Sequence, residues 1–104
     1  MTLETLQSWY AAHCNGDWEH SYGVQITTLD NPGWLVTIDL TGTDLEHLTC
    51  SHNEDRSESD WMTCSVENKK FTGCGDVNSL RRILDFFGSL IAGKNRPTQP
   101  SPGL

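Results

Sequence analysis

The fold of this chain is decided by residues 22–40, which read YGVQITTLDNPGWLVTIDL. On each side of the central DNPG, apolar residues alternate with polar ones, which is typical of strands that bury one face. Within the turn, Pro32 presets the first central dihedral angle, and Gly33 supplies the positive φ that a type II turn requires. Together with Asn31 these residues predict a structural turn, and the stretch as a whole predicts an antiparallel hairpin.

An amphipathic helix is predicted at each end of the chain. In residues 3–13 apolar side chains recur at three- and four-residue steps, Thr2 is available as the N-cap, and Cys14–Asp17 ends the helix. The second helix begins after Asp76 or Asn78, either of which is able to cap it. Its apolar stripe is formed by Leu80, Ile83, Leu84, Phe87, Leu90 and Ile91.

The strands between the helices are predicted from alternation and from the turns that separate them. They are residues 22–28, 34–40, 45–51 and 61–66, followed by a short edge strand at 71–72 that Gly73–Gly75 ends. Residues 53–60 are rich in carboxylates and are predicted to form an exposed, mobile loop.

These elements predict an α+β fold of two layers. An antiparallel sheet of four to five strands carries the N-terminal and the C-terminal helix on one face, because each helix needs an apolar sheet face for burial. The other face, with Gln25, Thr27, Thr37 and Asp39, looks toward water or a partner. We expect a single domain over residues 1–92 and a disordered tail over residues 93–104, since the tail has no apolar anchor.

Charge narrows the class of partner. Seven Lys and Arg stand against fourteen Asp and Glu, a formal net charge of −7. Phosphate contacts need clustered basic residues, so no nucleic acid is expected as a partner. The balance favours a basic partner through long-range attraction, although an acidic surface also serves solubility alone.

The apolar run Leu90–Ala92 is far too short to span a membrane, and Met1–Glu4 lacks the start of a secretion signal, so we expect a cytoplasmic protein with no membrane contact.

Asp17, Glu19 and His20 invite an enzymatic interpretation, because two carboxylates beside an imidazole are able to transfer protons. Neighbouring residues do not generally converge on one point, however, and neither a G-x-S-x-G motif nor a phosphate-binding loop is present. The pattern therefore favours a local role, in which Asp17 binds backbone donors and Trp18 packs on the first helix, or a contact with a partner.

Cysteine and histidine residues raise the question of a metal site. The candidates are His47, Cys50, His52, Cys64 and Cys74, with His13, Cys14 and His20 as helpers. Zinc sites usually show two closely spaced pairs, whereas only His47, Cys50 and His52 are clustered here, so no metal and no cofactor are expected. Without an export signal the four cysteines are expected to be reduced, with Cys64 packing as a small apolar residue.

Tryptophan and acidic residues are the remaining candidates for a binding surface. Trp9 and Trp34 are expected mainly in the core, whereas Trp18 and Trp61 border polar loops and are expected to be partly exposed. Residues 44–60 carry six carboxylates against one arginine, a pattern that usually marks only a solvated surface.

Four segments together form a distinctive pattern. They read LQSWY at residues 6–10, CNGDWEHSYG at 14–23, TLDNPGW at 28–34 and VTIDLTGTDL at 36–45. A weaker likeness covers Asp60-Trp61 and residues 80–87, and it fades across residues 48–60. This pattern resembles the immunity protein 53 family of bacterial polymorphic toxin systems, over roughly residues 3–88.

The resemblance implies an antidote that binds one cognate toxin stoichiometrically and catalyses no reaction. A nuclease-type toxin would present basic residues at its active site, where carboxylates of the antidote would replace substrate phosphates. The candidate partner-binding residues are Asp17, Trp18, Glu19, His20, Asp39, Asp44, Glu46, Glu54, Asp55, Glu58, Asp60 and Trp61. We expect a monomer or a weak homodimer. Two alternatives stay open: a small metal-dependent or hydrolytic enzyme that uses His20 with Asp17 and Glu19, and a generic interaction module.

Overall fold

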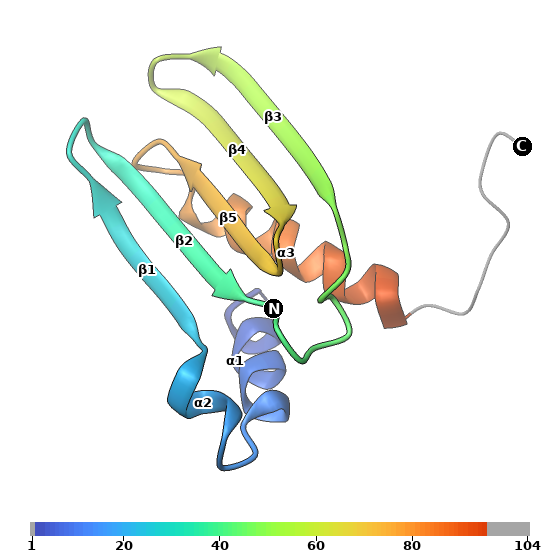
Figure 1. The fold of residues 1–104 in the computed structure, drawn as a ribbon. Helices are drawn as coiled ribbons and strands as arrows, with labels where there is room; N and C mark the ends of the chain where they lie inside the picture. Colours follow the sequence, from blue (N-terminus) through green and yellow to red (C-terminus); the bar gives the residue numbers. More distant parts are fainter. Residues whose placement is uncertain (1, 96–104) are drawn as a thin grey trace, which may run out of the picture.

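The computed structural model describes residues 2–95 and shows three helices and five strands (Figure 1). In chain order they are α1 (Thr2–His13), α2 (Trp18–Ser21), β1 (Val24–Leu29), β2 (Gly33–Asp39), β3 (Cys50–Ser57), β4 (Asp60–Glu67), β5 (Lys70–Gly75) and α3 (Leu80–Asn95). The strands form one antiparallel sheet in the order β1-β2-β5-β4-β3, so β5 lies in the centre and β1 and β3 lie at the edges.

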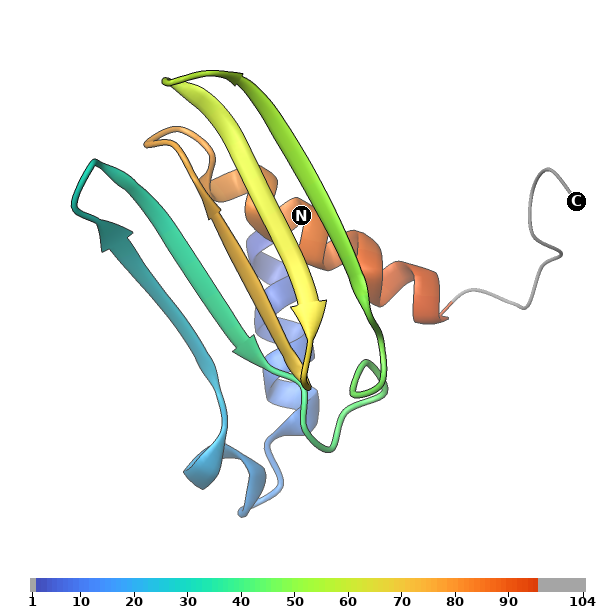
Figure 2. The same ribbon diagram turned by 45° about the horizontal axis from the view of Figure 1, so that its top comes forward.

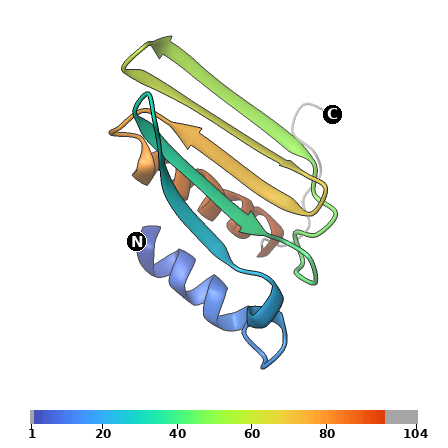
Figure 3. The same cartoon turned by 60° about the vertical axis from the view of Figure 1, so that its left-hand side comes forward.

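The two long helices, α1 and α3, cover the same face of this sheet (Figures 2 and 3). The α+β fold predicted from the sequence, with both terminal helices on one sheet face, is therefore confirmed. No helix in the described part of the chain is long and apolar enough to cross a membrane. The predicted tail lies, from residue 96 onward, outside the described residues.

The core lies between the helices and the sheet, because every second residue of the inner strands is apolar and faces the helices. The fully buried side chains include Val36 and Ile38 of β2, Cys64 and Val66 of β4, and Phe71 of β5. From the helix layer the core receives Leu6, Trp9, Ile83, Leu84 and Phe87. The burial of Trp9 and Cys64 agrees with the sequence-based expectation.

The β1–β2 hairpin is confirmed, but its predicted turn type is wrong. Leu29 pairs with Gly33, which leaves a three-residue loop, and Gly33 is not among the described residues with positive φ. Gly33 is needed for another reason: a Cβ at this position would clash with the carbonyl oxygen of Gly75 on β5. Close approach of two strands, rather than a left-handed turn, explains this glycine.

The prediction for residues 45–60 is also wrong. The third strand is Cys50–Ser57 rather than residues 45–51, and most of the predicted acidic loop therefore lies in β3. Residues 45–48 instead lie in a series of turns, in which the amide of Leu48 donates to the carbonyl oxygen of Leu45 at 3.1 Å. Charged residues normally argue against a strand, but the edge strand β3 tolerates them because one side and one face of it reach water, and Glu54 on the other face pairs with Arg82 of α3.

The predicted short edge strand at 71–72 is in fact the central strand β5, which continues through Gly73 and Gly75. Both glycines lie under α3. A Cβ on Gly73 would lie 2.5 Å from Cγ2 of Ile83, and one on Gly75 would lie 2.9 Å from Cβ of Ser79. The glycines therefore let the helix approach the sheet and do not end the strand.

The two helix N-termini also differ from the prediction. α1 begins at Thr2, so Thr2 lies within the helix rather than before it. For α3 the sequence pointed to Asp76 or Asn78, but Ser79 occupies the N-cap position, since its carbonyl oxygen accepts the amide of Ile83 at 3.0 Å. Asp76 lies in the turn before the helix, where its side chain accepts the amide of Asn78 at 2.7 Å.

Candidate functional site

The predicted partner-binding residues do not form one surface. One group lies around α2 and the segment that joins β2 to β3, at the lower end of the sheet in Figure 1: Asp17, Trp18, Glu19, His20, Asp39, Asp44 and Glu46. The other group lies on the β3–β4 hairpin, which extends to the upper end: Glu54, Asp55, Glu58, Asp60 and Trp61. The structure therefore offers two separate candidate surfaces.

In the first group, Glu19 is occupied by the backbone of its own loop. Its carboxylate accepts the amides of Asn15 at 2.9 Å and Gly16 at 2.8 Å, while the side-chain oxygen of Asn15 accepts the amides of Asp17 and Trp18, both at 2.9 Å. Hydrogen bonds from its own amide and from those of Asn15 and Gly16 hold the pKa of Glu19 below its usual value. Glu19 therefore stabilises the approach to α2.

Trp18 is 7% exposed, so the prediction of partial exposure is wrong. Its ring lies edge-on to Trp9 at 6.0 Å between centroids, and its Nε1 donates to the carbonyl oxygen of Thr41 at 2.7 Å. Trp18 thus ties α2 to α1 and to the segment after β2. The sequence suggested exposure because polar residues flank Trp18, but a four-residue helix is stabilised mainly by packing and therefore turns its one large apolar side chain inward.

The acid–base interpretation of Asp17, Glu19 and His20 is not supported by their geometry. In the described structure no hydrogen bond or ion pair joins these three side chains, and the carboxylate of Glu19 already accepts two amides. The bond between Asp17 and His20 is a backbone bond of 3.1 Å. The three residues build a short helix and its entry loop.

Asp39 and Glu46 likewise serve local structure. Asp39 accepts the amide of Gly23 at 3.0 Å and lies 3.8 Å from Nζ of Lys70. Glu46 accepts the amide of Gly42 at 3.1 Å, and this bond lowers the pKa of Glu46 together with the nearby ammonium of Lys69. Of this group, the carboxylates of Asp17 and Asp44 remain the most accessible.

In the second group, Arg82 of α3 is the centre of an ion-pair network. Its guanidinium lies 3.1 Å from Glu54, 3.3 Å from Asp60 and 3.4 Å from Asp76, measured between nitrogen and oxygen. Arg56 pairs with Glu54 at 3.3 Å and with Asp60 at 3.5 Å. Two of the predicted partner-binding carboxylates are thus neutralised within the molecule.

Glu54 also binds His52, whose Nε2 lies 2.8 Å from a carboxylate oxygen. The hydrogen bond from His52 and the positive charge of Arg56 hold the pKa of Glu54 below its ordinary value. The His52 ring in turn stacks on Phe86 of α3 at 5.1 Å. The edge strand β3 is therefore attached to α3 by a charged contact and by an aromatic one.

Asp76 is the buried member of the network, with 4% of its surface exposed. It accepts the amides of Trp61 at 2.8 Å and of Asn78 at 2.7 Å. Burial raises the pKa of Asp76, but these hydrogen bonds and Arg82 outweigh it and leave the pKa below its usual value. Sequence reasoning missed Asp76 and Arg82 as part of this region, because neither lies near Glu54 in sequence and no motif joins them.

What remains accessible on the hairpin is Asp55 and Glu58, two exposed carboxylates for which no ion pair is found within residues 2–95. Trp61 is half-buried beside them and pairs across the sheet with Asp55, in agreement with the expected partial exposure.

The sheet face opposite the helices is uncovered by any element of the described chain (Figure 3). The register places Leu35, Cys74 and Thr63 in one row across β2, β5 and β4, and Thr37, Thr72 and Ser65 in the next. All of these side chains are half-buried. The expectation that this face is open is confirmed. Its two middle rows are uncharged and mostly hydroxylic, and the row after them places Asp39, Lys70 and Glu67 across the same three strands.

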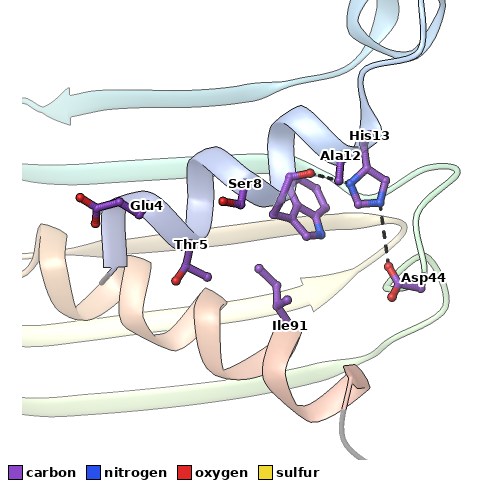
Figure 4. Close-up of a pocket in the computed structure, with 8 residues that line it drawn as sticks. Glu4, Thr5, Ser8, Ala12, His13, Asp44 and Ile91 are labelled. Carbon is purple, nitrogen blue, oxygen red and sulfur yellow. Dashed lines mark hydrogen bonds and ion pairs between the residues drawn. The ribbon is translucent and has the colours of Figure 1, made fainter.

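A hollow of about 520 Å³ lies between α1, α3 and the segment after β2 (Figure 4). Its polar lining includes Glu4, Ser8, His13 and Asp44, and Nε2 of His13 lies 3.9 Å from the carboxylate of Asp44, as the dashed line in Figure 4 marks. No cysteine lies among its lining residues, and the hollow is open to solvent. Its lining mixes these polar side chains with Trp9, Ala12 and Ile91 and holds no assembled nucleophile.

Among residues 2–95 no group of three or more His, Cys, Asp or Glu side chains is placed to hold a metal ion. All four cysteines are free thiols, and burial, the main cause, raises the pKa of Cys64 to about 12. Cys64 is therefore an inert member of the core at neutral pH.

The sequence of the chain matches the model of the immunity protein 53 family over residues 3–92. The chain belongs to this family. Neither the comparison with curated proteins nor the comparison with solved structures found a match.

Membership of this family implies toxin neutralisation. An immunity protein protects against a toxin, and proteins of this kind act on a toxin partner rather than on a substrate. The accessible features of this immunity protein are its exposed carboxylates, the open sheet face and the sheet edges.

Proposed function

We propose that this immunity protein neutralises one cognate toxin by binding it directly, in a one-to-one complex, in the cytoplasm of the producing cell. The observation that carries the proposal is the family match over residues 3–92, which covers every strand and nearly all of the helical structure. The scattered local roles of Asp17, Glu19 and His20 support binding over catalysis.

The charge distribution supports a basic partner. Residues 1–55 contain nine carboxylates and not one Lys or Arg. Such one-sided charge attracts a positively charged toxin over distances comparable to the Debye length, about 8 Å at physiological salt, and thereby speeds association. A toxin that acts on nucleic acid would carry a basic surface of this kind.

The accessible carboxylates are the best candidates for this attraction. Asp17, Asp44, Asp55 and Glu58 are exposed, and no Lys or Arg within the described residues pairs with them. In contrast, Glu54 and Asp60 are engaged with Arg82 and Arg56, so we assign them to the stability of the hairpin rather than to the toxin interface.

The experiment is co-expression of this chain with the toxic domain encoded immediately upstream of its gene, scored by cell survival and then by co-purification. The proposal predicts survival and a stable one-to-one complex, with no protection against an unrelated toxin domain as the control. Survival without any complex would indicate modification of the toxin instead of binding. If the cells are not protected at all, this toxin domain is not the partner.

A further inference from the structure

The edge strand β1 is open to pairing along its whole length. The amide of Asp39 donates to the carbonyl oxygen of Gly23 at 3.0 Å, which makes this pair a hydrogen-bonded one. Since hydrogen-bonded and non-bonded pairs alternate in an antiparallel ladder, the backbone N–H and C=O groups of Val24, Ile26 and Thr28 point away from β2. These six groups form a ready template for another strand.

β1 also lacks the features that normally protect an edge. It reads VQITTL, without a charged residue or a proline, and its register with β2 is regular over all six residues. Natural edge strands are usually interrupted by charges, prolines or bulges, because an unprotected edge pairs with other chains. An edge left open in this way suits a strand partner.

Apolar side chains gather beside this edge. Three of the exposed large apolar side chains lie here: Ile26 within β1, with 41% of its surface exposed, Tyr22 just before the strand, and Tyr10 on α1 beside its start. Between α1 and the start of β1 runs a groove of about 320 Å³, lined by Leu6, Gln7, Tyr10, Gly23 and Val24. A strand added to β1 would turn every second side chain toward the helix face of the sheet, and the one opposite Val24 would lie beside this groove.

We propose that an extended segment of the toxin pairs with β1 as a sixth strand and buries apolar side chains against α1. This inference rests on the proposed function, and it identifies the contact that the family match leaves open. Backbone hydrogen bonds would supply affinity, and the groove would select a segment whose alternate side chains are apolar.

Charge favours a basic toxin segment over a second copy of this chain. The elements around the edge, α1 to β2, carry Glu4, Asp17, Glu19, Asp30 and Asp39 and no Lys or Arg. In an antiparallel pairing of two β1 strands, Asp30 at the end of one strand would approach Asp17 and Glu19 before the other. Like charges would then meet at both ends, whereas a segment flanked by Lys or Arg would be attracted there.

The test is amide hydrogen exchange in the purified chain, alone and with an inactivated form of the toxin domain encoded upstream. We expect exchange at Val24, Ile26 and Thr28 to slow at least about tenfold in the complex, since these outward amides gain partners. Gln25 and Thr27 already donate to β2 and serve as internal references, with little change expected.

Two variants on opposite edges give a matched pair. Ile26→Lys removes an apolar contact and adds a positive charge at β1, and it should weaken toxin binding about tenfold or more. Asn53→Lys makes the same addition of charge on the exposed edge strand β3 and should weaken binding about threefold or less. Thr28→Pro removes one outward N–H without touching the β2 ladder, and a melting curve would show whether that variant folds.

The outcomes separate the inference from the function on which it rests. If the wild-type chain forms no complex with the toxin domain, the proposed function fails and this inference fails with it. If a complex forms while the three amides exchange unchanged and both lysine variants bind alike, the toxin docks elsewhere and only the inference is overturned. If these amides are protected in the chain alone and the chain has the mass of a dimer, a second copy of this chain, rather than a toxin segment, pairs with β1.

Discussion

The two edges of the sheet are built in opposite ways. β3 carries Glu54, Asp55 and Arg56, has a shift of register between Asp55 and Ser57, and is held to α3 through Arg82. β1 carries no charge, has no irregularity and is flanked by exposed apolar side chains. The charges and the bulge of β3 protect it from pairing with other chains, whereas β1 has neither and is free to accept a strand.

The acidic residues at the two edges have different surroundings. On the β3 side, buried or half-buried carboxylates offset arginines and fix the position of an edge strand. Around β1, carboxylates lie near the ends of an uncharged strand, where Asp39 pairs with Lys70 while Asp17 and Asp30 are exposed. Net charge alone does not distinguish these two groups of carboxylates.

The largest effect is expected from a change that separates the β1–β2 hairpin from the rest of the sheet. Gly33→Val would place a side chain against the carbonyl oxygen of Gly75 and crowd Cδ1 of Leu29, which lies 3.2 Å from the ideal Cβ position. Because backbone atoms cannot yield as flexible side chains do, we expect a loss of about 3 kcal/mol in the free energy of unfolding, measured in urea. Gly23→Ala is the control, since nothing lies within 4 Å of its added Cβ. Equal stability of the two variants would contradict this explanation of Gly33.

The next effect concerns the tether of β3. Asp76→Ala removes the acceptor for the amides of Trp61 and Asn78 and one partner of Arg82, so the unfolding free energy should fall by about 2–3 kcal/mol. Asp55→Ala, on the exposed side of the same region, should change it by less than about 0.5 kcal/mol. An effect as small as that of Asp55→Ala would contradict this structural role of Asp76.

Acid should weaken the β3 tether and the loop that leads to α2. The pKa values of Asp76, Glu54 and Glu19 lie below their usual values in the folded protein, so the unfolded chain binds protons more readily. Their stabilising contribution is complete above the unfolded pKa values, about 3.9 for Asp and 4.3 for Glu, and is lost as the pH falls through the lower folded values. Urea titrations at neutral and acidic pH should show this loss, and Asp76→Asn should reduce its size. A stability that stays constant from neutral pH to well below these values would refute the argument.

The smallest effect on the fold is expected from the exposed carboxylates of the hairpin. Asp55→Lys with Glu58→Lys should leave the unfolding free energy within about 0.5 kcal/mol, because neither residue belongs to the Arg82 network. The association rate with the toxin domain should fall several-fold at low salt, with less difference at high salt. An unchanged rate and salt dependence would place the hairpin outside the region that attracts the toxin, and would leave the β1 side as the source of attraction.

The parts of the fold that were predicted correctly are those in which local pattern and burial agree. The hairpin of residues 22–40 and both terminal helices show clear periodicity, and each has one face in the core. β3 and β5 were mistaken because their sequences contradict strand propensity: charges occupy an exposed edge, and glycines occupy a central strand beneath a helix. In both cases the strand depends on a neighbour from α3: Arg82 pairs with Glu54 of β3, and Ile83 packs over Gly73 of β5.

In the candidate site, too, features set by local sequence were predicted correctly and features set by distant residues were not. Exposed Asp55 and half-buried Trp61 were anticipated from local sequence, whereas the burial of Trp18 and the engagement of Glu54 and Asp60 were not. Whether a carboxylate is accessible depends on which cation lies beside it, and α3 brings Arg82 to β3 from more than twenty residues away.

The sequence by itself determined the family, the α+β class and the acidic balance of this protein, because motifs, periodicity and charge are properties of the chain in order. Only the tertiary structure decided which strands lie at the edges, which carboxylates are neutralised and which glycines permit close packing. Those features depend on strand order, and strand order arises when residues far apart in the chain bury the same apolar face together. The open edge at β1 is therefore a property of the folded sheet, although each of its six residues is ordinary in sequence.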